Sequence, residues 1–132
     1  MKRFLIVLLF LFTFNIVQAK HLYHEADYQK ARCSKNGGIL EYKNPDETRV
    51  DCLTKTHAVE FDFAKKWAES VGQAEHYALM TGKTGKVVLI IETIKDFKYL
   101  ERVKKLAKKH NFDVEYITPE IIINSGQKVV SK

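Results

Sequence analysis

Apolar residues recur along the chain with two spacings, one typical of strands and one typical of helices. Short apolar runs between turn residues predict strands. Apolar residues at i, i+4 and i+7, as at Trp67, Val71 and Ala74, predict an amphipathic helix. The predicted elements are, in order, a helix over 23–34, strands over 39–43, 48–53 and 58–63, a helix over 65–81, a strand over 86–92, a helix over 94–110 and a strand over 114–117. Residues 121–123 form either a final short strand or a packing segment.

This order predicts an α/β fold. The first three strands follow one another through short turns, whereas each of the last two strands follows a helix, which favours right-handed parallel crossovers. The run KVVLIIE at 86–92 is almost entirely apolar, as expected for a strand that is covered on both faces. We therefore expect a mixed β-sheet flanked by helices, in the order αβββαβαβ.

The first 19 residues have the pattern of a secretory signal peptide. Two basic residues precede an apolar run over 4–17, which is shorter than the roughly 20 residues of a membrane-spanning helix. Residues 17–19 (Val-Gln-Ala) fit the small-residue rule for cleavage, so we expect cleavage after Ala19. The prediction is an exported protein, periplasmic or secreted, with a single domain over 20–132 and no membrane insertion after processing. A retained N-terminal anchor is the alternative.

The chain is basic, with a net charge of +6. Removal of Lys2 and Arg3 with the leader leaves +4, because that segment holds no acid. This charge suits a polyanionic partner such as nucleic acid. Much of the excess lies over 95–109, where solvated surface lysines are the simpler explanation.

Two cysteines, Cys33 and Cys52, lie in the predicted mature chain. An exported chain meets an oxidising compartment, so the two could form a disulfide; two buried thiols are the alternative. Two cysteines cannot make a zinc site alone, and the five histidines lack metal-ligand spacing relative to them.

Carboxylates on two neighbouring predicted strands are the main candidates for chemistry. Alternation along the third strand places Glu60 and Asp62 on one face, and Asp51 lies on the preceding strand. If these two strands pair, Asp51 and Glu60 can converge. Two carboxylates, a backbone carbonyl and waters make a reasonable Mg²⁺ site, which would polarise a phosphate.

The following helix carries polar residues on one stripe, beside its apolar one. Lys66, Glu69, Gln73 and Tyr77 stand at successive offsets of 3, 7 and 11 residues from the first. A polar stripe on a helix that packs against a sheet is unusual, and a solvated face is its alternative explanation.

Together these residues resemble the PD-(D/E)XK nuclease superfamily. The resemblance rests on Asp51, on the Glu60-Phe61-Asp62 run, and on Gln73 and Tyr77, which match the Gln-x-x-x-Tyr helical motif of its RecB-type branch. It covers roughly residues 22–118. The resemblance implies a restriction-endonuclease-like fold and a metal-dependent nuclease that uses Mg²⁺ or Mn²⁺.

Further roles follow from the resemblance alone. Asp51, Glu60 and the Phe61 carbonyl would bind the metal, and Glu25 would be the acidic residue on the first helix. Gln73 and Tyr77 would orient the site or contact nucleic acid.

The sequence departs from the family at one chemically important position. The family lysine should stand two residues after Glu60, where this chain has Asp62. Lys66 on the next helix is the candidate replacement, and Lys65 lies off the Gln73 stripe. The first expectation is therefore an exported nuclease that hydrolyses phosphodiester bonds. The alternative is a catalytically inactive nuclease-fold module that binds nucleic acid or a protein partner in the envelope; a purely structural envelope protein is a third option.

Overall fold

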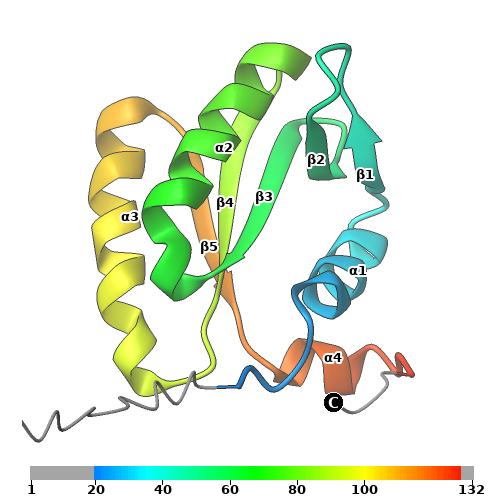
Figure 1. Ribbon diagram of the computed structural model, residues 1–132, viewed down its shortest axis with the longest axis vertical. Coiled ribbons are helices and arrows are strands. Elements are labelled where there is room, and N and C mark those ends of the chain that lie inside the picture. The colour runs from blue at the N-terminus through cyan, green and yellow to red at the C-terminus, as the bar shows by residue number, and fades with distance from the viewer. Residues whose placement is uncertain (1–19, 129–132) are drawn as a thin grey trace, which may run out of the picture.

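The computed structural model describes residues 20–128 as four helices around a mixed sheet (Figure 1). The predicted leader, residues 1–19, lies outside the described residues. The elements are α1 (Glu25–Lys35), β1 (Ile39–Lys43), β2 (Arg49–Leu53), β3 (His57–Phe63), α2 (Trp67–Thr81), β4 (Thr84–Ile90), α3 (Phe97–His110), β5 (Asp113–Ile117) and α4 (Glu120–Asn124). Short 3-10 segments, Ala64–Lys66 and Ile94–Asp96, lead into α2 and α3. The predicted α/β class with a mixed sheet is confirmed.

The five strands lie in sequence order across the sheet. Strands β1, β2 and β3 pair antiparallel, and β3, β4 and β5 pair parallel. The β3–β4 ladder runs over all seven residues of both strands, whereas the Cα register between β2 and β3 covers only two pairs, Cys52↔Val59 and Leu53↔Ala58. The β1–β2 hairpin therefore leaves the sheet shortly after it joins it.

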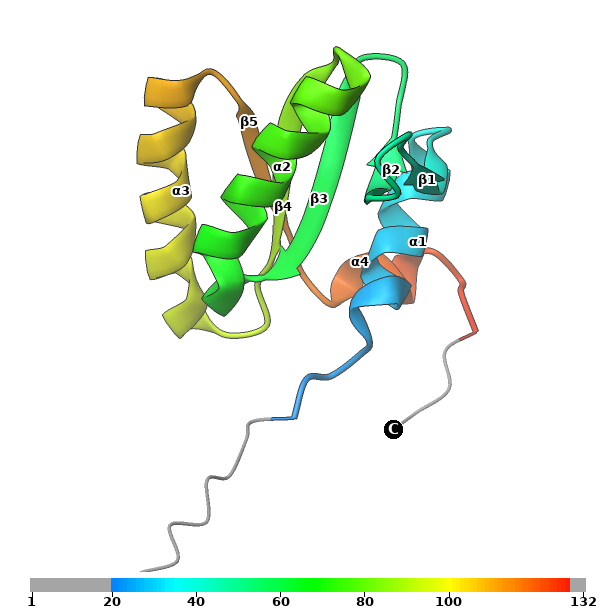
Figure 2. The same cartoon turned by 45° about the horizontal axis from the view of Figure 1, so that its top comes forward.

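Helices cover both faces of the sheet (Figure 2). Residues of β4 alternate between two cores: Val87 and Leu89 pack with α2 and α3, while Val88 and Ile90 pack with α1 and α4. This two-sided burial explains the almost entirely apolar sequence of β4.

The structure revises two predicted boundaries at the ends of the domain. Helix α1 begins at Glu25, since the Asp27 carboxylate accepts a 3.1 Å hydrogen bond from the His24 N–H group and ends the extended segment there. The strand alternative for residues 121–123 is wrong, because they form the helix α4, which begins directly after Pro119. The packing alternative is confirmed by the burial of Ile122 in the core.

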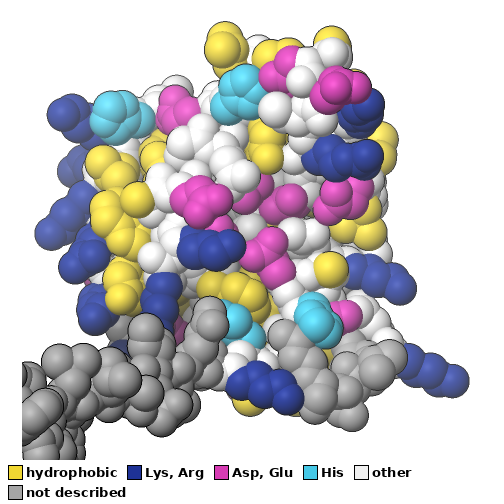
Figure 3. Space-filling model, in the orientation of Figure 1, with side chains coloured by type: hydrophobic (Ala, Val, Ile, Leu, Met, Phe, Trp, Pro, Cys, Tyr) yellow, Lys and Arg dark blue, Asp and Glu magenta, His cyan; other side chains and the backbone are white. Residues whose placement is uncertain are grey.

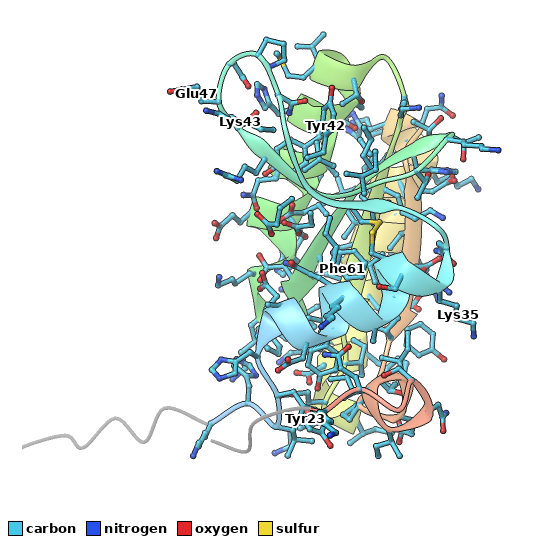
Figure 4. All side chains as sticks on the ribbon, turned by 90° about the vertical axis from the view of Figure 1, so that its right-hand side faces the viewer. Tyr23, Lys35, Tyr42, Lys43, Glu47 and Phe61 are labelled. Atoms are coloured by element: carbon cyan, nitrogen blue, oxygen red, sulfur yellow. A yellow bond between two sulfur atoms is a disulfide. The ribbon has the colours of Figure 1, made fainter. Side chains whose placement is uncertain are left out.

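A disulfide joins Cys33 on α1 to Cys52 on β2, as one of the two alternatives predicted (Figure 4). Both cysteines are buried. Gly38 directly precedes β1. It lies so close to both sulfur atoms that a Cβ atom at this position would overlap them. Across residues 20–128, every helix is too short or too polar to cross a membrane.

Replacement of both cysteines by alanine should lower the free energy of unfolding by about 3 kcal/mol, since the disulfide closes a loop of 19 residues in the unfolded chain. Urea unfolding of the Cys33→Ala/Cys52→Ala variant, followed by circular dichroism, measures the change. Reduced wild-type protein is the control and should lose a similar amount. An unchanged midpoint in both samples would contradict the prediction.

Candidate functional site

The candidate site lies where β2 separates from β3. Beyond Leu53 and Cys52 the two strands no longer pair, and the side chain of Asp51 reaches across to β3 instead. Its Oδ2 atom accepts a 2.7 Å hydrogen bond from the Phe61 backbone N–H group. A carboxylate thus replaces the backbone carbonyl that a longer ladder would have supplied.

Phe61 contributes its backbone to the site and its side chain to the core. The ring is 1% exposed and packs beneath α1 (Figure 4). In a strand, the N–H and C=O groups of one residue point to the same edge. The Phe61 carbonyl therefore faces the Asp51 edge as well, where the predicted metal ligand would have to be.

Four carboxyl side chains meet at this place, which we call the acid cluster: Glu25, Asp51, Glu60 and Asp62. Glu60 and Asp62 are buried, at 4% and 3% exposure. The Glu60 carboxyl group lies next to that of Asp51, and the Asp62 carboxyl group lies next to that of Glu25. The structure thus brings together the three predicted strand acids and the acid from α1.

Burial dominates the electrostatics of the acid cluster. Desolvation, and after it the Asp51 carboxylate, raises the pKa of Glu60 far above its usual range. Desolvation also raises the pKa of Asp51, of Asp62 and of Glu25. Four acids in a poorly solvated place cannot all carry a charge without a cation, so protons are shared between them.

Two buried oxygen atoms in the acid cluster have no hydrogen-bond donor. Within the described residues, no N–H or hydroxyl group donates to Glu60 Oε2 or to Asp62 Oδ1. Buried polar atoms are nearly always paired, so such atoms call for an explanation. A hard divalent cation such as Mg²⁺ or Mn²⁺ takes oxygen ligands of this kind.

The donor chemistry therefore fits a divalent ion, but the side chains are not arranged around one. Among residues 20–128, no group of three His, Cys, Asp or Glu side chains has the geometry of a metal site. The Asp51 and Glu60 carboxyl groups instead lie next to each other. Metal binding would have to displace the shared proton and separate these two carboxyl groups.

Lys66 reaches the acid cluster through Asp62. Its Nζ atom lies 3.6 Å from Asp62 Oδ1, which is an ion pair too long for a hydrogen bond. The Asp62 charge raises the pKa of Lys66. The charges that act most strongly on Glu60 are those of other carboxyl groups. The Lys66 ammonium therefore interacts more strongly with Asp62 and Glu25 than with Glu60.

The polar stripe of α2 is only partly a solvated face. Tyr77 is buried at 6% exposure beside Val50 and Ala58, and Gln73 lies one turn before it on the same side of α2. Burial, followed by the Glu60 and Asp51 charges, raises the pKa of Tyr77. The two predicted Gln-x-x-x-Tyr residues thus lie next to each other at the rim of the acid cluster.

Glu41 is a neighbour of the site that the sequence analysis missed. The β1–β2 register pairs Leu40 with Cys52 and Tyr42 with Val50, which places Glu41 opposite Asp51. Its charge raises the pKa of Asp51. Its φ of 53° lies in the left-handed region, at a cost of roughly 1–2 kcal/mol for a residue other than glycine. No spacing rule marks this residue, since the positive φ appears only in three dimensions.

The turn of the β1–β2 hairpin contacts α2 through a hydrogen bond. Asp46 Oδ2 lies 2.7 Å from His76 Nε2, and Asp46 also accepts a 2.6 Å hydrogen bond from Thr48. Figure 3 shows Asp and Glu side chains gathered between α2 and the hairpin, on one face of the molecule. The acid cluster is therefore enclosed by α1, β3, α2 and the hairpin.

No protein-family model, curated protein or solved structure matches this chain.

In the absence of metal, the protein should lose stability as the pH rises from about 5 to about 8. The raised pKa values, about 6 for Asp51 and about 7 for Asp62, mean that the folded protein keeps protons that the unfolded chain releases near pH 4. The stabilisation from these retained protons is complete at a pH below the pKa values of the unfolded chain. It is lost as the pH rises through the pKa values of the folded protein. Melting temperatures in EDTA across this range test the slope.

Asp51→Asn keeps an acceptor for the Phe61 N–H group but removes one buried acid. Its melting temperature should fall less steeply with pH than that of the wild type. Every other titratable group is common to both proteins, so the difference between the slopes reports the acid cluster. Equal slopes would contradict the prediction.

Proposed function

We propose that this chain is an exported nuclease of the PD-(D/E)XK type, which hydrolyses phosphodiester bonds of nucleic acid with Mg²⁺ or Mn²⁺. The observation that carries the proposal is the buried Glu60 Oε2 atom, which has neither a hydrogen-bond donor nor an ion pair within the described residues and lies beside Asp51, where β2 leaves β3. The order of elements from α1 to β5, which is the order expected of that superfamily, supports it. The disulfide is compatible with export to an oxidising compartment.

In this proposal, Asp51, Glu60 and the Phe61 carbonyl hold the ion. A bound Mg²⁺ supplies Lewis-acid chemistry to the phosphate and to the attacking water. The Phe61 N–H group fixes one Asp51 oxygen, and the other would act as a ligand once the proton shared with Glu60 is displaced. Lys66 stabilises the negative charge that develops on the phosphate, while Gln73 and Tyr77 orient the rim of the site and Glu25 positions water.

A second candidate is the catalytically inactive module that binds nucleic acid or an envelope protein. The specific observation that favours it is the contact between Lys66 and Asp62. Asp62 stands where the superfamily has its lysine and also neutralises the lysine proposed to replace it. The protein would then use the fold without the chemistry.

The test is cleavage of DNA and RNA, single- and double-stranded, with Mg²⁺, Mn²⁺ or EDTA. Asp51→Asn, Glu60→Gln and Lys66→Met should each lower the metal-dependent rate by about 10²-fold or more, since each removes a ligand or a charge at the reacting phosphate. Lys65→Met is the matched control, because Lys65 is exposed and adjacent to Lys66.

The two candidates give different results in this experiment. Cleavage that survives Lys65→Met but not Lys66→Met supports the enzyme. A folded protein that cleaves none of the substrates, and whose melting temperature is unchanged by Mg²⁺ or Mn²⁺, overturns the nuclease proposal and leaves the binding module.

A further inference from the structure

One side of α3 carries a continuous row of cations. Lys98, Arg102, Lys105 and Lys109 stand at i, i+4, i+7 and i+11 and are all exposed. We call these four residues the cation row. It spans about 17 Å at 1.5 Å per residue. The buried stripe of α3, formed by Leu100, Val103 and Ala107, lies on the other side of the helix.

The cation row is not neutralised within the protein. Every Asp and Glu of the chain lies in the described segment, and none of them forms an ion pair with the row. The one ion pair of α3 in this segment joins Lys104 to Glu101 at 2.8 Å. One acid, Glu101, stands beside the row, three residues after Lys98 and four before Lys105, and it pairs with Lys104 and not with the row.

Aromatic rings accompany the cation row on the side that faces α2. The Arg102 guanidinium lies 5.5 Å from the centre of the Trp67 ring and 5.3 Å from that of Tyr99. Lys98 lies 4.9 Å from the Tyr99 ring. Both rings are half-buried. The contacts hold the first two cations of the row in place, which lowers the entropy lost when they bind a ligand.

Cations along α3 and acids beyond α2 lie on the same face of the molecule (Figure 3). Lys and Arg side chains form a column along α3, and Asp and Glu side chains gather on the far side of α2. The acid cluster repels any polyanion that approaches it, so a nucleic acid cleaved there needs to be held elsewhere. An unneutralised row of cations on the same face meets this need.

We propose that the cation row binds the phosphate backbone of nucleic acid and holds the strand across α2, with another stretch of it over the acid cluster. This inference rests on the proposed function for the choice of partner. Its physical basis is counterion release, in which each cation that replaces a condensed counterion adds to the salt dependence of binding. The row supplies affinity without reading base sequence.

The test is the salt dependence of binding, measured by fluorescence anisotropy with labelled duplex DNA in EDTA, so that cleavage does not interfere. The plot of log K against log salt between about 50 and 200 mM should become shallower by about 2 in Lys98→Gln/Lys105→Gln, since two phosphate contacts are lost. The matched control is Lys30→Gln/Lys108→Gln, which has the same net charge and changes two exposed lysines outside the row. Its slope should stay close to that of the wild type.

Equal slopes in the two double variants would overturn the proposal, because net charge and not the row would then govern binding. Vesicles that contain anionic phosphatidylglycerol are the second probe. Binding of the wild type to vesicles and not to DNA, lost in the row variant alone, would also overturn it and assign the row to a membrane surface. The result is separable from the nuclease proposal: a protein that never cleaves, yet shows the row-specific change in slope with DNA, keeps the binding surface and loses the enzyme.

Discussion

The hydrogen bond from the Phe61 N–H group to the Asp51 carboxylate determines how this molecule is built around its candidate site. Strand β3 has a full ladder on its β4 side and only two register pairs on its β2 side. The side chain satisfies a backbone donor that would otherwise be buried and unpaired where β2 departs. The hairpin can therefore leave the sheet, and the space between it and α2 is filled by acids.

That arrangement carries a cost in stability. Two buried carboxyl groups with unpartnered oxygen atoms, and a glutamate in the left-handed region, each destabilise the folded state. Other contacts offset the cost: the disulfide fixes the base of β2 to α1, and Asp46 with His76 fixes the hairpin tip to α2. A cation that bound here would remove part of the strain by replacing the shared protons.

The sequence was enough to predict the elements whose pattern is local. The almost entirely apolar run of β4, the helical spacing that begins at Trp67 and the period-two alternation around Glu60 all led to the observed elements, and the shared face of Glu60 and Asp62 placed both in the acid cluster. Helix α4 was missed, since three isoleucines in a row fit a strand or a helix equally well. Glu41 was missed because its position depends on the hairpin register and on a positive φ. The contact between Lys66 and Asp62 could not be predicted either. The two residues are four apart, but the chain changes from a strand to a helix between them, so neither the strand period nor the helix period fixes where the lysine side chain points.

Cys52 directly follows Asp51, and Cys33 lies on the helix that carries Glu25. One covalent bond thus joins the two segments that deliver acids to the cluster from outside β3. In a reducing cytosol that bond is absent, and the relative position of these two acids then depends on the packing of α1 in the core and on the hydrogen bond from Phe61 to Asp51. The geometry of the acid cluster would then depend on the redox state of the compartment that holds the protein.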